Sequence, residues 1–186
     1  MPRPNFFFAF PLDGSFVATL PKPPPAIRRY VPDDVHLTLT FLGACGDVAA
    51  NRALAALDEV LSSGPKRPLD VSLGAVVPMG PRRTYSALSA LLDRGREETE
   101  AFIGAVRDPL SEAAIGRREK RAPKAHVTIA RPLRRATDAD RESGVAWADS
   151  LDLGTVHQTL DRVALYTWSD DRPRRLFKII ATRTLF

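Results

Sequence analysis

Short runs of apolar or alternating residues, typical of β-strands, recur along the chain. The first run, Phe6 to Phe10, is apolar throughout and stops at Pro11, which predicts a buried strand followed by a turn. The runs that we predict to be strands cover residues 6–10, 35–42, 69–77, 84–88, 125–130, 160–168 and 176–184. The last two runs are expected to pair with each other.

The run 35–42 has a regular alternation of polar and apolar residues. Successive side chains of a strand point to opposite faces of the sheet. One face is therefore expected to carry His36, Thr38 and Thr40. The other face is expected to carry Leu37, Leu39 and Phe41. This pattern predicts a strand that is buried on one side only.

Helical spacing of apolar residues appears in the first half of the chain and again near its middle. Asp47 can cap a helix that ends at Gly64-Pro65. A second helix is expected to start at Asp93, and Pro109 either kinks it or begins another short helix.

A third helix is expected after Thr137, which can cap it, and should run through Trp147. The stretch 20–30 is different because it contains four prolines. Proline has no N–H donor and favours an extended path, which leaves room for at most a short helical turn over 26–30.

The order of these elements indicates the fold class. Strands and helices occur in mixed runs without strict alternation, which favours an α+β fold with largely antiparallel sheets. No low-complexity segment or linker divides the chain, so residues 1–186 are expected to form a single domain. The one internal repeat is a strand with the pattern His-apolar-Thr-apolar in each half of the chain, which suggests two related lobes that face each other.

Composition narrows the function only slightly. The chain has 186 residues, 44% of them hydrophobic, which is enough for a buried core. Its net charge of +5 favours anionic partners such as phosphates, nucleic acid or acidic lipid. Cys45 is the only cysteine, which excludes an internal disulfide and fits the cytoplasm, where we expect the protein. The apolar run that follows Met1 to Asn5 is too short for a signal peptide or a membrane span.

The candidate chemistry centres on the three histidines, because each is followed two positions later by a threonine. In a strand, that spacing places both side chains on the same face. Only His36 with Thr38 and His126 with Thr128 also keep an apolar residue between and after the pair. His157 lacks this frame, so we interpret it as a strand-edge or loop residue without a catalytic role.

Two such pairs provide the groups that opening a cyclic phosphodiester requires. One imidazole activates water on one side of phosphorus, and a second protonates the departing oxygen on the other; a pKa of about 6.5 suits both roles. The threonine hydroxyls are neutral donors to phosphoryl oxygens. Either motif alone is more often a half-exposed histidine beside a β-favouring threonine. The presence of both, in the same apolar frame, favours catalysis.

Three segments of the chain resemble the 2H phosphoesterases. They are Phe7-Phe-Ala-Phe10, the run 29–43 with the sequence Arg-Tyr-Val-Pro-Asp-Asp-Val-His-Leu-Thr-Leu-Thr-Phe-Leu-Gly, and the run 123–131 with the sequence Pro-Lys-Ala-His-Val-Thr-Ile-Ala-Arg. Within that superfamily the chain is most similar to the LigT-like RNA 2′,3′-cyclic phosphodiesterases, also called 2′-5′ RNA ligases. The likeness covers essentially the whole chain, including the closing strands.

The resemblance implies a bilobal α+β fold in which two largely antiparallel sheets face a central cleft, with helices on the outside. It implies metal-independent hydrolysis of RNA 2′,3′-cyclic phosphate ends to a 2′-phosphate, with 2′-5′ RNA ligation as a reverse or side reaction. By the same resemblance His126 would activate water and His36 would protonate the leaving 3′-oxygen, although the sequence itself does not separate acid from base. Relatives usually have a full helix before the first motif, where this chain has a shorter, proline-rich segment.

Basic residues flank the second motif. Arg131 closes it as in many relatives, where it is expected to neutralise phosphate. Strict alternation from His126 would point Arg131 to the other face, so a bulge or the end of the strand must turn it inward. Phosphate binding and a plain surface role are equally open for it. A basic stretch before His126 either attracts an RNA backbone or is a solvated loop. This stretch contains Arg117, Arg118, Lys120, Arg121 and Lys124.

The sequence indicates no other chemistry. It has no histidine pair at metal-ligand spacing, no Walker-type glycine-rich loop and no clear Gly-x-Ser-x-Gly turn. We expect no metal, no cofactor and no use of ATP, and a monomer that binds RNA but neither a membrane nor an obligate protein partner. Two alternatives stay open: a phosphodiesterase for a small cyclic nucleotide or a 2′-5′ oligonucleotide, and a non-catalytic RNA-binding module.

Overall fold

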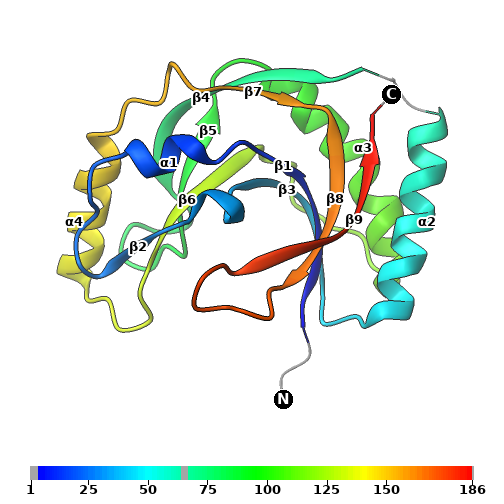
Figure 1. The fold of residues 1–186 in the computed structure, drawn as a ribbon, viewed down its shortest axis with the longest axis horizontal. Coiled ribbons are helices and arrows are strands. Elements are labelled where there is room, and N and C mark those ends of the chain that lie inside the picture. Colours follow the sequence, from blue (N-terminus) through cyan, green and yellow to red (C-terminus); the bar gives the residue numbers. More distant parts are fainter. Residues whose placement is uncertain (1–3, 64–66, 186) are drawn as a thin grey trace.

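The strands of the computed structural model join edge to edge through antiparallel pairs (Figure 1). The structure describes residues 4–63 and 67–185. The strand order is β7-β4-β5-β6-β3-β1-β8-β9, and β2 pairs with β6. The strands are β1 (Phe6–Pro11), β2 (Ile27–Arg29), β3 (His36–Gly43), β4 (Leu69–Pro78), β5 (Leu88–Leu92), β6 (His126–Pro132), β7 (His157–Leu160), β8 (Arg162–Trp168) and β9 (Phe177–Thr184).

The strand order is symmetric about the β3–β6 pair. Outward from that pair, β3 is followed by β1, β8 and β9, and β6 is followed by β5, β4 and β7. The two halves meet through a short pairing in which Leu37 lies opposite Val127. The α+β class and the antiparallel pairing predicted from the sequence are confirmed. The two predicted sheets are linked by this short pairing into one strand order.

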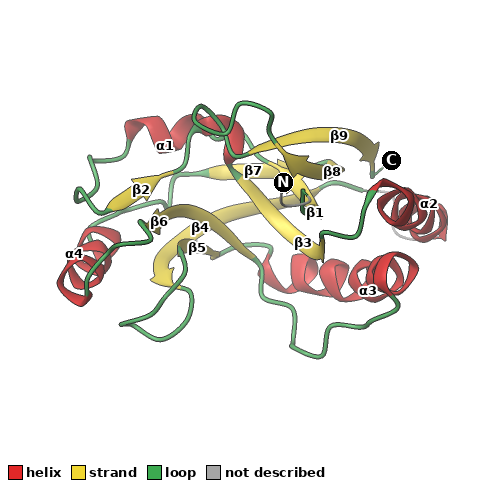
Figure 2. Ribbon diagram, turned by 90° about the horizontal axis from the view of Figure 1, so that it is seen from below, coloured by secondary structure: helices red, strands yellow, loops and turns green. Residues whose placement is uncertain are grey.

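The three longest helices lie at the two ends of the molecule, and the shortest lies between those ends (Figure 1). The helices are α1 (Ser15–Thr19), α2 (Asp47–Ser63), α3 (Arg96–Ile115) and α4 (Asp138–Asp149), with a 3₁₀ turn η1 over Pro32–Asp34. At one end α2 packs on α3, which also contacts β3, whereas α4 lies at the other end and contacts β4 (Figures 1 and 2). Within residues 4–63 and 67–185, no helix is both long and apolar enough to cross a membrane.

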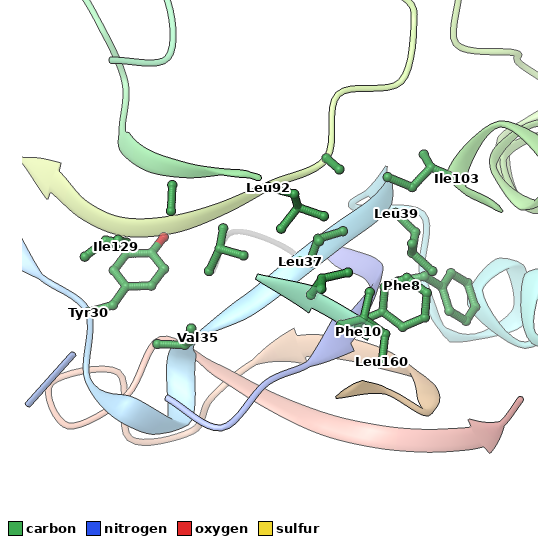
Figure 3. Close-up of a cluster of buried hydrophobic side chains, with 14 of the residues drawn as sticks. Phe8, Phe10, Tyr30, Val35, Leu37, Leu39, Leu92, Ile103, Ile129 and Leu160 are labelled. Carbon is green, nitrogen blue, oxygen red and sulfur yellow. The ribbon is translucent and has the colours of Figure 1, made fainter. Parts of the chain in front are cut away.

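The main core fills the space between one face of the sheet and the helices. Figure 3 shows Phe8, Phe10, Leu37 and Leu92, which come from β1, β3 and β5, gathered in one cluster. The predicted burial of β1 is confirmed, because every residue from Phe6 to Phe10 is at most 2% exposed. The alternate residues of β1 point to the opposite face of the sheet. There they form a second, smaller cluster of Phe7, Ala9, Ala164 and Tyr166.

Two boundaries in the middle of the chain differ from the sequence prediction. The strand expected over 84–88 is β5, which starts at Leu88, because Tyr85 instead anchors a loop by donating its hydroxyl to the Arg141 carbonyl at 3.0 Å. The helix expected from Asp93 begins at Arg96, after Gly95 with its positive φ of 74°. That helix, α3, continues through Pro109 as one element.

The proline-rich segment follows an extended path, as its prolines predict. Residues 27–29 form β2 and pair with β6, so this stretch does not use the room that the prolines left for a short helical turn over 26–30. The helical turn of this region is α1, which lies before the prolines. The cap predicted at Thr137 is confirmed, with a reciprocal hydrogen-bond pair to Asp140. Helix α2 starts at Asp47 as predicted, and the expected stop at Gly64-Pro65 lies outside the described residues.

Candidate active site

The register of the β3–β6 pair places the four predicted site residues on one face. Leu37 and Val127 lie opposite each other and are fully buried in the main core. Opposite residues of an antiparallel pair share a face, and their chain neighbours point to the other face. Continuing this register puts His36 beside Thr128 and His126 beside Thr38, away from the main core.

The two histidines are held in the same way. Nδ1 of His36 lies 2.7 Å from the carbonyl oxygen of Asp34, and Nδ1 of His126 lies 2.7 Å from that of Lys124. A carbonyl oxygen only accepts hydrogen bonds, so Nδ1 carries the proton in both rings. Each Nε2 is consequently left as the nitrogen that can take or give a proton in chemistry.

Aromatic rings enclose His36. The ring centroids of Phe7, Tyr166 and Phe177 lie 4.9, 5.4 and 5.4 Å from that of His36, and the imidazole is 6% exposed. The pKa of His36 is lowered to about 4, mainly by burial and to a smaller extent by the charges of Arg131 and His126. The hydrogen bond to Asp34 works in the opposite direction. His36 is therefore neutral at pH 7.

The turn before His36 is fixed by a buried carboxylate. Asp34 is 2% exposed, and its side chain accepts hydrogen bonds from the backbone N–H groups of Leu176 and Phe177 at 2.8 and 3.1 Å. Its backbone carbonyl holds His36. Asp34 thus connects the first histidine to the start of β9, which also supplies the Phe177 ring.

Among the described residues, the Thr128 hydroxyl has a hydroxyl partner and the Thr38 hydroxyl has no equivalent one. Ser89 of β5 lies opposite Thr128, and their hydroxyl oxygens are 3.2 Å apart. Ala9 occupies the corresponding position opposite Thr38. Ser89 is fully buried, so it can orient the Thr128 hydroxyl toward a ligand without contacting that ligand itself.

Both motif strands have a bulge at the same position. Phe8 and Ala9 pair with Thr40 and Thr38, which skips Leu39, and Leu88 and Ser89 pair with Ala130 and Thr128, which skips Ile129. The skipped residue lies three positions after the histidine in each motif. A bulge inserts one residue and so reverses the alternation of faces beyond it.

The first bulge corrects the faces predicted for β3. Thr40 turns to the core face, where it is 5% exposed and its hydroxyl lies 2.9 Å from that of Ser111 on α3. Phe41, expected in the core, is 64% exposed and lies on the histidine face against Phe7, with ring centroids 5.6 Å apart.

The second bulge has the same effect on Arg131. This arginine needed a bulge or the end of the strand to reach the histidine face. It is exposed, and its guanidinium lies 6.0 Å from the centre of the Tyr30 ring. Its charge acts on His36. The structure therefore brings Arg131 to the His36 side of the site.

Comparison with known proteins depends on the fold, because no family model matches the chain and no curated protein matches it. A solved structure of LigT from E. coli is 16% identical and superposes with a TM-score of 0.67, covering 99% of this chain and 98% of LigT. The chain has the LigT fold. TT0787 from Thermus thermophilus (18% identity, TM-score 0.73, 97% of each chain) and a structure described as a phosphoesterase (18%, 0.68, 99% of this chain and 98% of the other) are similar as well.

The LigT-like fold places the third histidine far from the other two along the sheet. His157 starts β7, which pairs with β4 at the end of the strand order, and the residue is exposed. Its position on an edge strand is as predicted. It lines a shallow hollow of about 230 Å³ together with Asp70 and Arg94.

The basic stretch before β6 is partly neutralised by its own neighbours. Arg118 pairs with Glu112 at 2.8 Å, and Arg121 pairs with Glu119 at 2.7 Å. All four side chains except that of Glu119 are more than half exposed, so these ion pairs contribute little to stability.

Sequence reasoning missed the roles of Ser89 and Asp34. Ser89 could have been found from the polar position within the apolar run 88–92, whereas no local signal marks Asp34.

Proposed function

We propose that the protein hydrolyses 2′,3′-cyclic phosphate ends of RNA and leaves a 2′-phosphate. One observation carries this proposal: two histidines from opposite halves of the sheet share a face, each with Nδ1–H fixed by a carbonyl and Nε2 left for chemistry. General acid–base catalysis at phosphorus needs two such groups. We also propose that the chain forms a single domain of two related lobes, as expected from the sequence.

The reaction needs one proton acceptor and one proton donor. One Nε2 removes a proton from water while the water oxygen attacks phosphorus. The bond between phosphorus and the 3′-oxygen breaks, and the other Nε2–H gives its proton to that oxygen. Thr38 and Thr128 donate hydrogen bonds to the phosphoryl oxygens, where negative charge is held through the transition state. The products are a 2′-phosphate and a free 3′-hydroxyl.

The state of His36 bears on which histidine is the base. Burial keeps His36 neutral in the free protein, and its unprotonated Nε2 is ready to accept a proton. We propose that His36 activates water and His126 protonates the 3′-oxygen, the reverse of the division that the family resemblance implies. The acid limb of the pH profile of kcat/KM reports the base in the free enzyme. An apparent pKa close to that of His36, about 4, is expected.

Ligands of the structurally similar LigT support a nucleotide substrate. Solved LigT structures contain 3′-AMP and phosphate, and others contain ATP and NADP⁺. A 3′-AMP molecule carries phosphate on the ribose edge where a 2′,3′-cyclic phosphate is closed. Together with the net charge of +5, this supports an RNA end as substrate.

Hydrolysis of an oligonucleotide with a 2′,3′-cyclic phosphate end, measured in EDTA, tests the proposal. His36→Ala and His126→Ala are each expected to lower kcat by about 100-fold or more. His157→Ala serves as the matched control and should keep wild-type activity. Absence of hydrolysis by the wild type, or full activity of both site variants, would contradict the proposal.

A substrate panel separates this function from its alternatives. Cyclic mononucleotides and 2′-5′ oligonucleotides should turn over more slowly than the RNA end. A non-catalytic RNA-binding module, favoured by the basic stretch alone, would instead bind RNA equally well after both histidine substitutions and form no product.

A further inference from the structure

Two arginines face each other next to the candidate active site. Arg28 of β2 lies directly opposite Arg131 of β6 in the antiparallel register. Side chains in such positions share a face, with Cβ atoms about 5 Å apart, and like charges there destabilise the pairing. Because Arg131 lies beyond the bulge on the histidine face, Arg28 is on that face too.

Neither arginine has a carboxylate partner. Both are exposed, and within residues 4–63 and 67–185 neither forms an ion pair or a hydrogen bond to an acidic side chain. Asp34, the acid whose pKa responds to Arg28, is not available to them. Its carboxylate is buried and accepts hydrogen bonds from the backbone of β9 and the residue before it.

The arginine pair lies on the His36 side of the site. The charge of Arg131 acts on His36, and the charges of Arg28 and Arg131 both act on Tyr30. Arg131 lies three positions after Thr128 on β6, at most about 10 Å along an extended strand. A phosphate held by the threonines therefore leaves the two guanidinium groups free to bind a second phosphate nearby.

We infer that Arg28 and Arg131 form a subsite for the phosphate on the 5′ side of the cyclised nucleotide. This inference rests on the proposed function, which places the cyclic phosphate between the two histidines. Guanidinium groups bind phosphate oxygens through paired N–H donors, and one anion between two arginines removes their mutual repulsion. The same phosphate is the internucleotide diester of an RNA strand or the 5′-phosphate of a single nucleotide.

The subsite makes substrate choice depend on a phosphate remote from the reacting bond. Three substrates resolve it: a nucleoside 2′,3′-cyclic phosphate, the same compound with a 5′-phosphate, and a dinucleotide ending in a 2′,3′-cyclic phosphate. The wild type is expected to prefer the last two. If the wild type prefers only the 5′-phosphorylated nucleotide, the subsite binds a terminal 5′-phosphate. If it prefers only the dinucleotide, the subsite binds the internucleotide phosphodiester.

Arg28→Ala is the decisive variant, and the readout is the ratio of kcat/KM for each phosphate-bearing substrate to that for the simple cyclic phosphate. Loss of one charge-assisted contact should lower this ratio about tenfold, chiefly through KM. The dependence of dinucleotide affinity on salt should also weaken, by about one unit of slope.

Arg94→Ala is the matched control. Arg94 is exposed and follows β5 beyond Leu91, the residue opposite His126, so it lies toward the other end of β6 from Arg28. Its substitution removes the same charge and should leave the ratio unchanged. The subsite is overturned if the wild type has no preference, if the kcat/KM ratio is unchanged in Arg28→Ala, or if the ratio falls equally in both variants. Failure of the proposed function is distinct, since the wild type would then hydrolyse none of the three substrates.

Discussion

The two histidines make equivalent hydrogen bonds but have different surroundings. Both rings are fixed through Nδ1 by the carbonyl two residues earlier. His36 is enclosed by three aromatic rings, whereas His126 is only partly buried. Because burial disfavours a charged imidazole, the enclosure couples the protonation of His36 to folding.

The stability of the protein should fall in mild acid because of His36. Its folded pKa of about 4 lies below the unfolded value of 6.5, so the unfolded chain binds the proton more tightly. The stabilisation that a neutral His36 provides is complete above the unfolded pKa and is lost as pH falls toward 4, amounting to about 3 kcal/mol. Denaturant unfolding of wild type and His36→Gln between pH 7 and 4 measures it. Equal pH dependence of the two proteins would contradict the prediction.

Removal of the Ser89 hydroxyl should affect activity more than its stability cost suggests. Ser89→Ala leaves the Thr128 hydroxyl without its buried partner and is expected to lower kcat several-fold and the free energy of unfolding by about 1 kcal/mol. Ser111→Ala removes the partner of Thr40, another buried hydroxyl pair away from the histidine face. It should cost similar stability and no activity. Steady-state kinetics and urea unfolding of both variants compare them.

Among the elements, the two motif strands show what alternation can and cannot predict. Period-two spacing was enough to place His36, Thr38, His126 and Thr128 on one face. It failed for Phe41, because a bulge at Leu39 reverses the pattern and no glycine marks that bulge in the sequence. The same spacing required a bulge or the end of the strand to turn Arg131 inward, and the structure has a bulge at Ile129.

Alanine substitution is expected to have opposite effects on stability at two glycines, Gly144 of α4 and Gly104 of α3. A Cβ at Gly144 would lie 2.7 Å from the Ile27 side chain and closer still to the Tyr85 hydroxyl, so Gly144→Ala should destabilise by about 1–3 kcal/mol. At Gly104 the nearest atom would be 3.6 Å away, an ordinary contact. Gly104→Ala should stabilise by about 0.5–1 kcal/mol through better helix propensity. Thermal unfolding of both variants tests these expectations, and Tm shifts of the same sign would contradict them.

At the scale of the whole molecule, the contacts that complete the site join distant parts of the chain. Asp34 and Leu176 are 142 residues apart, and their hydrogen bond docks the start of β9 next to the first histidine. Local patterns predicted the Thr137 cap, most strands and the paired motifs. They carry no information about which loop closes over which strand, so the enclosure of His36 emerged only from the fold.

Asp34→Ala should loosen this connection. Two backbone N–H groups would lose their acceptor, at a cost of about 1–3 kcal/mol. Faster hydrogen exchange is expected at the amides of Leu176 and Phe177, with the α4 amides as an internal reference. Asp34→Asn keeps one acceptor oxygen and should lie between Asp34→Ala and the wild type. Unchanged exchange at both amides would show that the carboxylate does not hold β9.

The short pairing of β3 with β6 has a mechanical consequence. The two halves of the strand order meet where Leu37 faces Val127, and each half carries one histidine on the opposite face. A narrow joint of this kind bends more easily than a long ladder of hydrogen bonds. Bending about it would change the separation of the two imidazoles directly, so the stiffness of this joint contributes to how accurately the two rings are aligned.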